Sequence, residues 1–136
     1  MKKKIFLFII TVVIIIGLYG FTYIPKNIIS IQPNNVSKIE IFDGNRGELI
    51  TISNSEQTEH IISNLNKITF KKDKPSIGYM GYKFRMTIYD DKGRKYKEII
   101  INSNERIRYR GFFYIDESGK IDEDYINALF EKDESK

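Results

Sequence analysis

The longest apolar run in the chain covers residues 5–24 and contains no charged side chain. At about 1.5 Å of rise per residue, a helix of this length spans about 30 Å, the thickness of a bilayer core. A helix that is apolar around its whole circumference and follows a lysine cluster is typical of a membrane span. Residues 1–24 are therefore predicted to form a short basic start and a transmembrane helix that ends before Pro25.

The residues on either side of this run predict its orientation. Lys2, Lys3 and Lys4 precede it. Basic residues stay on the cytoplasmic side, so a single-pass protein with its C-terminal domain outside is expected. Tyr19 and Tyr23 lie near the other end, where aromatic rings favour the membrane–water interface. A cleaved signal peptide is the alternative, but its apolar stretch has about 7–15 residues and ends in small residues. The longer run here favours an uncleaved signal-anchor in the cell membrane.

Alternating apolar and polar residues in the rest of the chain predict antiparallel strands. Residues 25–35 hold two of the three prolines and are predicted to form a linker. Its apolar residues Ile28, Ile29 and Ile31 either pack on the domain or lie at the membrane surface. The strands are predicted at residues 36–43, 48–53, 82–88, 94–102, 106–110 and 111–116.

Two segments have the period of an amphipathic helix. The first follows Ser53 and Ser55, which are candidate N-caps, and Ser53 with Glu56 matches a capping box. The second begins at Asp122, whose carboxylate can cap it. The apolar faces consist of Ile61, Ile62, Leu65 and Ile68 in the first helix and Ile126, Leu129 and Phe130 in the second.

After the transmembrane helix, the predicted order of elements is β-β-α-β-β-β-β-α. Runs of strands interrupted by two helices are typical of an α+β fold, an antiparallel sheet with both helices packed on one face. We therefore expect one extracytoplasmic domain over residues 36–131 and a tail over residues 132–136 that frays.

The composition argues against several kinds of chemistry. The chain has no cysteine and a single histidine, His60, so disulfides are excluded and a zinc site, which needs three or four ligands, is not expected. His60 is interpreted as a partly exposed helix residue rather than a catalytic base. The acidic stretch 116–124 departs from the calcium-binding EF-hand pattern and is interpreted as a turn before a helix. No catalytic residue, metal site or cofactor is expected.

The net charge of +4 does not indicate nucleic-acid binding. Lys2, Lys3 and Lys4 supply three of the 22 basic residues, which leaves the remainder almost balanced against 18 acidic residues. The high pI is therefore a property of the segment before the apolar run. Within the remainder the charge is uneven, because residues 66–110 hold 13 Lys or Arg against five Asp or Glu.

Five cations of this basic segment form a candidate patch for an anionic partner. Alternate residues of a strand point to the same side, so these cations line the open side of a sheet whose other side is covered by helices. Lipid headgroups, an anionic wall polymer or an acidic protein surface are the expected partners outside a membrane. The alternative is a sheet face that is charged for solubility. The patch consists of Lys83, Arg85, Arg106, Arg108 and Arg110.

Three functional hypotheses follow. The first is a non-enzymatic, membrane-tethered domain that binds an envelope protein or an anionic envelope component. The second is a small structural subunit of a membrane complex, with the span as its interface. The third is a carboxylate-dependent envelope hydrolase, since a glycosidase needs two carboxylates in a cleft. The candidate carboxylates for the third are Asp90, Asp91, Asp116 and Glu117.

The layout of the chain also carries a resemblance. It combines basic residues 2–4, an isoleucine-rich span and a short domain that contains KPSIGY at 74–79 and RYRGFFYID at 108–116. In these features the chain resembles small membrane-anchored exported proteins of unknown function from low-GC Gram-positive bacteria. The resemblance implies a cell-envelope location and transfers no functional residues.

Overall fold

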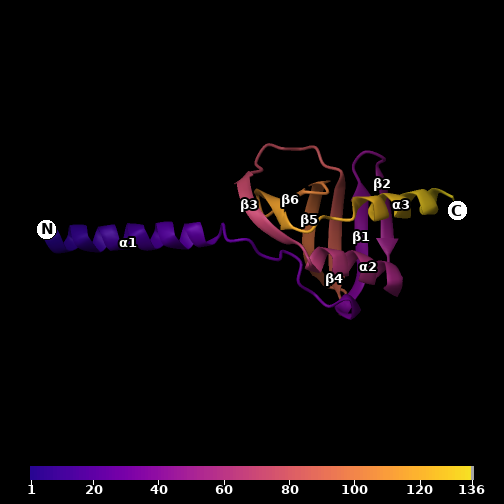
Figure 1. Cartoon of the computed structure of the whole chain (residues 1–136), viewed down its shortest axis with the longest axis horizontal. Helices are drawn as coiled ribbons and strands as arrows, with labels where there is room; N and C mark the ends of the chain where they lie inside the picture. The colour runs from indigo at the N-terminus through magenta and orange to yellow at the C-terminus, as the bar shows by residue number, and fades with distance from the viewer. Residues whose placement is uncertain (136) are drawn as a thin grey trace.

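The computed structural model describes residues 1–135, a long N-terminal helix joined to an α+β domain (Figure 1). The helices are α1 (Lys2–Phe21), α2 (Ser55–Asn66) and α3 (Glu123–Glu134), with a short 3-10 helix, η1 (Pro33–Asn35). The strands are β1 (Val36–Asp43), β2 (Glu48–Ile52), β3 (Thr69–Pro75), β4 (Phe84–Asp90), β5 (Lys95–Ser103), β6 (Arg106–Tyr109) and β7 (Phe112–Ser118). The predicted α+β class is confirmed.

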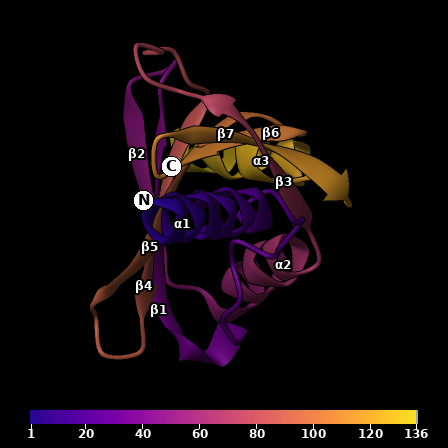
Figure 2. The same cartoon turned by 90° about the vertical axis from the view of Figure 1, so that its left-hand side faces the viewer.

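Seven strands form one antiparallel sheet in the order β2-β1-β4-β5-β6-β7-β3. Strand β3 is the edge nearest α1, and β2 is the edge at the opposite end (Figure 1). Helices α2 and α3 lie on the same side of β1, β4 and β5, and β6 and β7 curl over α3 (Figure 2). One face of the sheet is therefore covered by helices, and the other is open.

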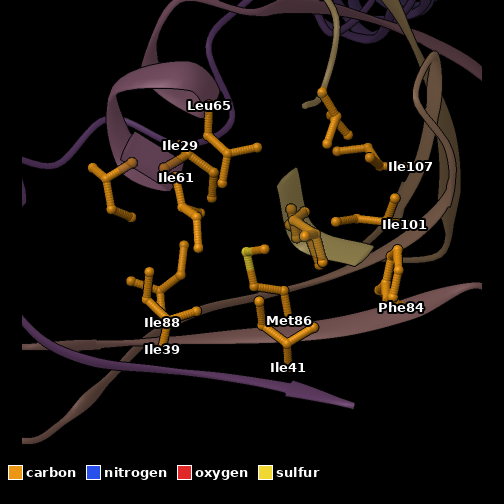
Figure 3. Packing of buried hydrophobic residues seen from close by; sticks show 14 of the residues in the cluster. Ile29, Ile39, Ile41, Ile61, Leu65, Phe84, Met86, Ile88, Ile101 and Ile107 are labelled. Atoms are coloured by element: carbon orange, nitrogen blue, oxygen red, sulfur yellow. The ribbon is translucent and has the colours of Figure 1, made fainter. Parts of the chain in front are cut away.

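The covered face of the sheet forms the hydrophobic core (Figure 3). Ile41 of β1 and Met86 of β4 point into it and are fully buried. Leu65 of α2 packs above them, and the ring of Phe130 from α3 stacks on Phe84 at 5.8 Å. Burying one such side chain stabilises the fold by about 1.5–3 kcal/mol, so both helices are held to this face.

Strand β3 is not evident from the sequence pattern. Its residues read TFKKDKP, and Phe70 alone among them is buried. The charges and the proline at the other positions suit an edge strand that is protected from further pairing. The predicted order of elements is therefore one strand short, because an edge strand does not need the apolar alternation of a half-buried one.

The N-cap of α2 is a correction to the sequence prediction. Oδ1 of Asn54 accepts a hydrogen bond from the Gln57 N–H at 3.1 Å. Asn54 is therefore the N-cap, and the assignment to Ser53 or Ser55 is wrong. The side-chain cap therefore lies one residue later than Ser53, the N-cap of the predicted capping box.

Helix α3 begins where the sequence predicts and ends later. Oδ1 of Asp122 accepts a hydrogen bond from the Tyr125 N–H at 3.2 Å, which caps the first turn. The helix continues to Glu134, so part of the tail that was expected to fray is helical. Lys136, the last residue of that tail, lies outside the described residues.

The segment expected to be a linker, residues 25–35, is packed on the domain. Ile28 and Ile29 are fully buried in the core. Lys26 and Phe70 exchange two backbone hydrogen bonds, at 3.0 and 2.8 Å, which extends the sheet beyond β3. Of the two sequence-based alternatives, packing on the domain is the one observed, and the folded part begins before Val36.

Helix α1 stands apart from this core. None of its side chains is buried. Among the described residues it is the one helix long and apolar enough to span a membrane, and a signal sequence has the same length and composition. The chain thus consists of an exposed apolar helix and a domain whose core is complete without it.

Candidate interaction face

The open face of the sheet carries a row of side chains that crosses six strands. The strand register places one outward residue of each strand beside the next, from β2 to β7. Their neighbours along the strands, such as Ile41, Met86 and Ile107, point into the core because successive residues face opposite sides. This outer row consists of Leu49, Phe42, Arg85, Ile100, Arg108 and Phe113.

Arg85 is the exposed cation near the middle of the outer row. Its guanidinium carbon lies 5.2 Å from the ring centroid of Phe42 and 5.9 Å from that of Tyr82. Within residues 1–135, no carboxylate forms an ion pair with it. Aromatic rings attract a cation through their quadrupole without neutralising its charge. Arg85 is thus oriented by rings and keeps its charge available.

A hollow of about 250 Å³ lies beside Arg85, and its other charged groups are already paired. Nζ of Lys38 donates to Oε1 of Glu40 at 2.8 Å, and the Tyr89 hydroxyl donates to Oε2 at 3.0 Å. The Lys38 ammonium, followed by the Tyr89 hydroxyl, holds the pKa of Glu40 below its ordinary value. Glu98 likewise accepts from Lys95 and Thr87. The hollow is lined by Glu40, Phe42, Leu49, Arg85, Thr87, Tyr89, Lys95 and Glu98.

Arg108 lies in the same row but is occupied by the chain itself. Its guanidinium donates to the carbonyl oxygens of Tyr79 and Gly81, at 2.5 and 2.8 Å, and to Oδ1 of Asn102 at 3.3 Å. These bonds fasten the loop between β3 and β4 over the outer face. The role of Arg108 is therefore to hold this loop.

Arg106 lies on the same face as Arg108, two residues earlier on β6. Its guanidinium carbon is 5.4 Å from the ring centroid of Phe113. Phe113 is only 3% exposed, because the ring of Tyr79 covers it edge-on at 4.9 Å. Arg106, like Arg85, is a cation on an aromatic support.

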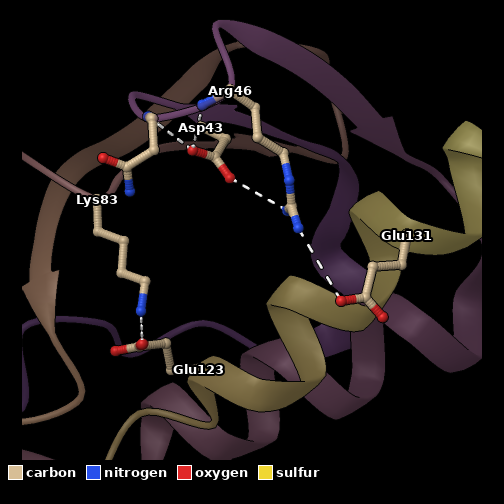
Figure 4. A network of polar contacts seen from close by, with 6 residues as sticks. Asp43, Arg46, Lys83, Glu123 and Glu131 are labelled. Carbon is tan, nitrogen blue, oxygen red and sulfur yellow. Dashed lines mark hydrogen bonds and ion pairs between the residues drawn. The ribbon is translucent and has the colours of Figure 1, made fainter.

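The structure separates the five cations of the predicted patch. Arg85, Arg106 and Arg108 share the outer face. Lys83 precedes β4, outside the pleat that fixes side-chain direction, and its ammonium pairs with Glu123 of α3 (Figure 4). Arg110 lies in the β6–β7 turn with a φ of 47°. The alternation that grouped these residues therefore holds within the strands and fails at their ends.

A second polar cluster ties the β1–β2 turn to α3 (Figure 4). Asp43 is buried and accepts hydrogen bonds from the N–H groups of Asn45 and Arg46, at 2.8 and 3.0 Å. The Arg46 guanidinium reaches both Asp43, at 3.3 Å, and Glu131, at 4.0 Å. A buried carboxylate with this many donors is satisfied, so the cluster fixes the turn.

His60 lies in the seam between α2 and α3. Its Nε2 is 2.8 Å from Oδ2 of Asp122, and its ring stacks on Tyr125 with 3.7 Å between centroids. The side chains of His60 and Asp122 are 43% and 42% exposed. His60, Asp122 and Ser63 line a shallow hollow in this seam. Among the described residues, no hydrogen bond joins Ser63 to His60. The sequence does not reveal this pairing, which joins the second helix to the cap of the third.

The four candidate carboxylates do not converge. Asp90 and Asp91 end β4 and begin its turn, whereas Asp116 and Glu117 lie on β7, three strands away in the sheet. Neighbouring strands lie about 4.8 Å apart, so a separation of three strands is larger than the roughly 5–9.5 Å between the two carboxylates of a glycosidase. Hydrogen bonds from the Arg94 N–H, followed by that of Lys92, hold the pKa of Asp90 below its ordinary value. This geometry gives no support to a carboxylate pair.

Among residues 1–135, no three His, Cys, Asp or Glu side chains are placed to hold a metal ion. The outer face offers cations near aromatic rings, a hollow, and acidic groups that already accept hydrogen bonds. No family model, no curated protein and no solved structure matches the chain.

Proposed function

We propose that the chain is a membrane-tethered interaction domain that binds an acidic partner of the cell envelope through the outer face of its sheet. The observation that carries this proposal is the outer row, in which Arg85 is exposed, oriented by two rings and without a carboxylate partner among residues 1–135. Aromatic residues and arginine are the side chains that contribute most to binding energy at protein interfaces.

The tether in this proposal is α1. Lys2, Lys3 and Lys4 are the first residues of α1 and precede its uninterrupted apolar run, and basic residues remain on the cytoplasmic side. This orientation places the domain outside the membrane. The layout resemblance to small exported envelope proteins supports the same location.

The two helices on the inner face of the sheet support the outer face as the binding surface. Helices α2 and α3 occupy one side of the sheet, so a partner can reach only the other side or an edge. On that other side Leu49 is 59% exposed at the end of the row. Apolar, aromatic and cationic groups are thus adjacent on a rigid strand surface, which keeps the cost of ordering side chains on binding low.

The test compares two double variants of the full-length, tagged chain in cells. Arg85→Ser with Arg106→Ser removes two cations from the outer face and leaves Arg108 to hold its loop. Lys67→Ser with Lys132→Ser removes two cations from the helix side. Chemical cross-linking on whole cells is followed by quantification of each cross-linked product.

Removing an arginine at a binding hot spot costs about 2 kcal/mol or more, so the first double variant is expected to lose the cross-linked product at least about 10-fold. The control variant is expected to retain it. Equal yields from both variants, with unchanged thermal unfolding, would remove the outer face from the proposal.

A structural subunit of a membrane complex is the second candidate, and one observation favours it. No side chain of α1 is buried by the domain, so its whole circumference is free to pack against another helix. Replacing α1 with an unrelated span, while keeping residues 25–136, separates the two candidates. Loss of cross-linked product on this exchange would favour the span as the interface.

A further inference from the structure

The β3–β4 loop, residues 76–83, exposes apolar side chains that the outer-face proposal does not use. Ile77 is 87% exposed and Met80 is 88% exposed, the highest values for large apolar side chains between residues 22 and 135. Tyr79 between them is about half exposed. Exposed apolar side chains that cluster in this way mark a contact site more often than single ones do.

The loop is held in one shape while these side chains point away. Arg108 donates to the carbonyls of Tyr79 and Gly81, and Asn102 donates to Gly81 as well, at 3.1 Å. The Lys74 ammonium donates to the Tyr79 hydroxyl at 3.2 Å. The exposure is therefore a feature of the folded loop and does not come from a loose tip.

A chain of contacts links the loop to the end of α1. Nζ of Lys72 on β3 donates to Oγ1 of Thr22 at 3.3 Å and lies 3.8 Å from the ring centroid of Phe112. Next to Phe112, the carbonyl of Gly111 accepts from the Ser76 N–H at 2.9 Å, where the loop begins. In Figure 1 the loop leaves β3, the strand nearest α1. The loop thus starts within a few side chains of the helix end.

This position lies at the level where a spanning helix meets the headgroups. Lys72 is also 5.2 Å from the ring centroids of both Tyr19 and Tyr23, and tyrosine rings favour the membrane–water interface. If α1 spans a bilayer, β3 and the first residues of the loop face its outer surface.

The cations around the loop match that surface in charge. Lys71, Lys74 and Arg110 are exposed, and Arg110 is in the turn that contacts Ser76. Asp73 is the one acid on β3. Basic residues beside inserted apolar side chains are the combination that binds anionic bilayers.

We infer that the β3–β4 loop and the cations Lys71, Lys74 and Arg110 form a second membrane contact, with Ile77 and Met80 inserted among anionic lipid headgroups. The contact rests on α1 being the tether. It would fix the tilt of the domain relative to the membrane. The loop would thus bind anionic lipids, whereas the outer face is proposed to bind an acidic envelope partner.

Site-specific fluorescence labelling tests this contact. The chain has no cysteine, so each introduced cysteine is the single attachment point for an environment-sensitive fluorophore. The full-length chain carries Ile77→Cys or Met80→Cys for the loop. Lys132→Cys is the water-exposed control, in the last turn of α3, the helix whose C-terminal end lies on the side of the domain opposite α1 (Figure 1). Thr11→Cys in the middle of α1 reports on the span itself. Each is reconstituted in vesicles of phosphatidylcholine alone or mixed in equal amounts with phosphatidylglycerol.

The contact predicts that the labels at 77 and 80 shift to the blue and are quenched by lipid-borne nitroxide in the anionic vesicles, several-fold more than in neutral vesicles. The label at 132 is expected to stay in water in both. Lys71→Gln with Arg110→Asn should abolish the shift, while Lys67→Gln with Lys92→Gln should leave it unchanged.

The outcomes separate this contact from the tether. A buried label at 11 with water-exposed labels at 77 and 80 would overturn the lipid contact and leave the tether standing. A water-exposed label at 11 would overturn both. Equal burial of the loop labels in neutral vesicles would overturn the anionic assignment. Shielding only in native membranes would assign the loop to a protein and overturn the lipid contact.

Discussion

At the scale of single residues, Arg85 and Arg108 show how the same side chain serves two purposes on one face. The Arg108 guanidinium donates to two loop carbonyls and to an amide oxygen, whereas the Arg85 guanidinium lies near the rings of Phe42 and Tyr82 and forms no ion pair within residues 1–135. A cation held by rings is oriented but not neutralised. This difference is the reason why we propose Arg85 as the side chain that contacts an acidic partner.

Residue-scale sequence reasoning identified the cations but not their partners. Strand alternation correctly places Arg85, Arg106 and Arg108 on one face. It does not place Lys83, because a residue just outside a strand is free to turn toward Glu123 of α3. Such long-range pairs depend on the packing of helices that single-residue patterns do not contain.

Acid sensitivity is a prediction at this scale. The pKa of Asp90 is lowered by hydrogen bonds from the Arg94 and Lys92 N–H groups. A carboxyl with a lowered folded-state pKa stabilises the fold fully above its unfolded value of about 3.9 and loses that contribution as the pH falls through the folded value. Asp90→Asn should therefore lower the thermal midpoint at neutral pH, and the difference from the parent chain should shrink as the pH falls below the unfolded value of about 3.9.

The measurement is thermal unfolding of the full chain in detergent across this pH range. Asp91→Asn is the matched control, since the described residues give Asp91 no hydrogen-bond partner. If the thermal midpoints of Asp90→Asn and the parent chain differ by the same amount at every pH, the Asp90 carboxylate does not stabilise the fold in this way.

At the scale of elements, the strands with strong alternation and both amphipathic helices were predictable, and β3 was not. The alternation of β4 reflects a strand with one face in the core, whereas β3 is a charged edge with Phe70 as its one buried side chain. Strand β3 pairs with β7, a neighbour far along the chain, and its charged residues lack the apolar alternation by which a strand is predicted from the local sequence.

The start of α2 gives the element-scale prediction. Asn54→Ala removes the side-chain oxygen that caps the Gln57 N–H and should lower the free energy of unfolding by about 1 kcal/mol. Ser53→Ala should change it by less than about half of that, because Ser53 is not the cap. Chemical denaturation of the three proteins is the measurement, and a larger effect at Ser53 would contradict the assignment.

At the scale of the whole molecule, the segment after α1 joins the helix to the domain as a packed element. Ile28 and Ile29 enter the core, and Lys26 pairs with Phe70. The sequence does not decide whether residues 25–35 pack on the domain, because two prolines among isoleucines are compatible with a free linker and with a packed segment. The domain is therefore held close to the end of its helix.

Truncating the packed segment tests this directly. Ile29→Ala creates a cavity at a fully buried position and should destabilise the domain by about 2–5 kcal/mol. Ile24→Ala, at a position that is 53% exposed, should have almost no effect in detergent. Similar small losses from both substitutions would mean that the segment is a flexible linker.

In the proposed function, α1 remains attached to the domain and holds it on the outer side of the membrane. This tether is tested most directly by the intact mass of a C-terminally tagged chain, combined with external protease on whole cells. If α1 is the tether, the product is expected to be full-length and membrane-bound, and the external protease is expected to remove its tag. A shortened product in the medium, or a tag protected from the protease, would contradict it.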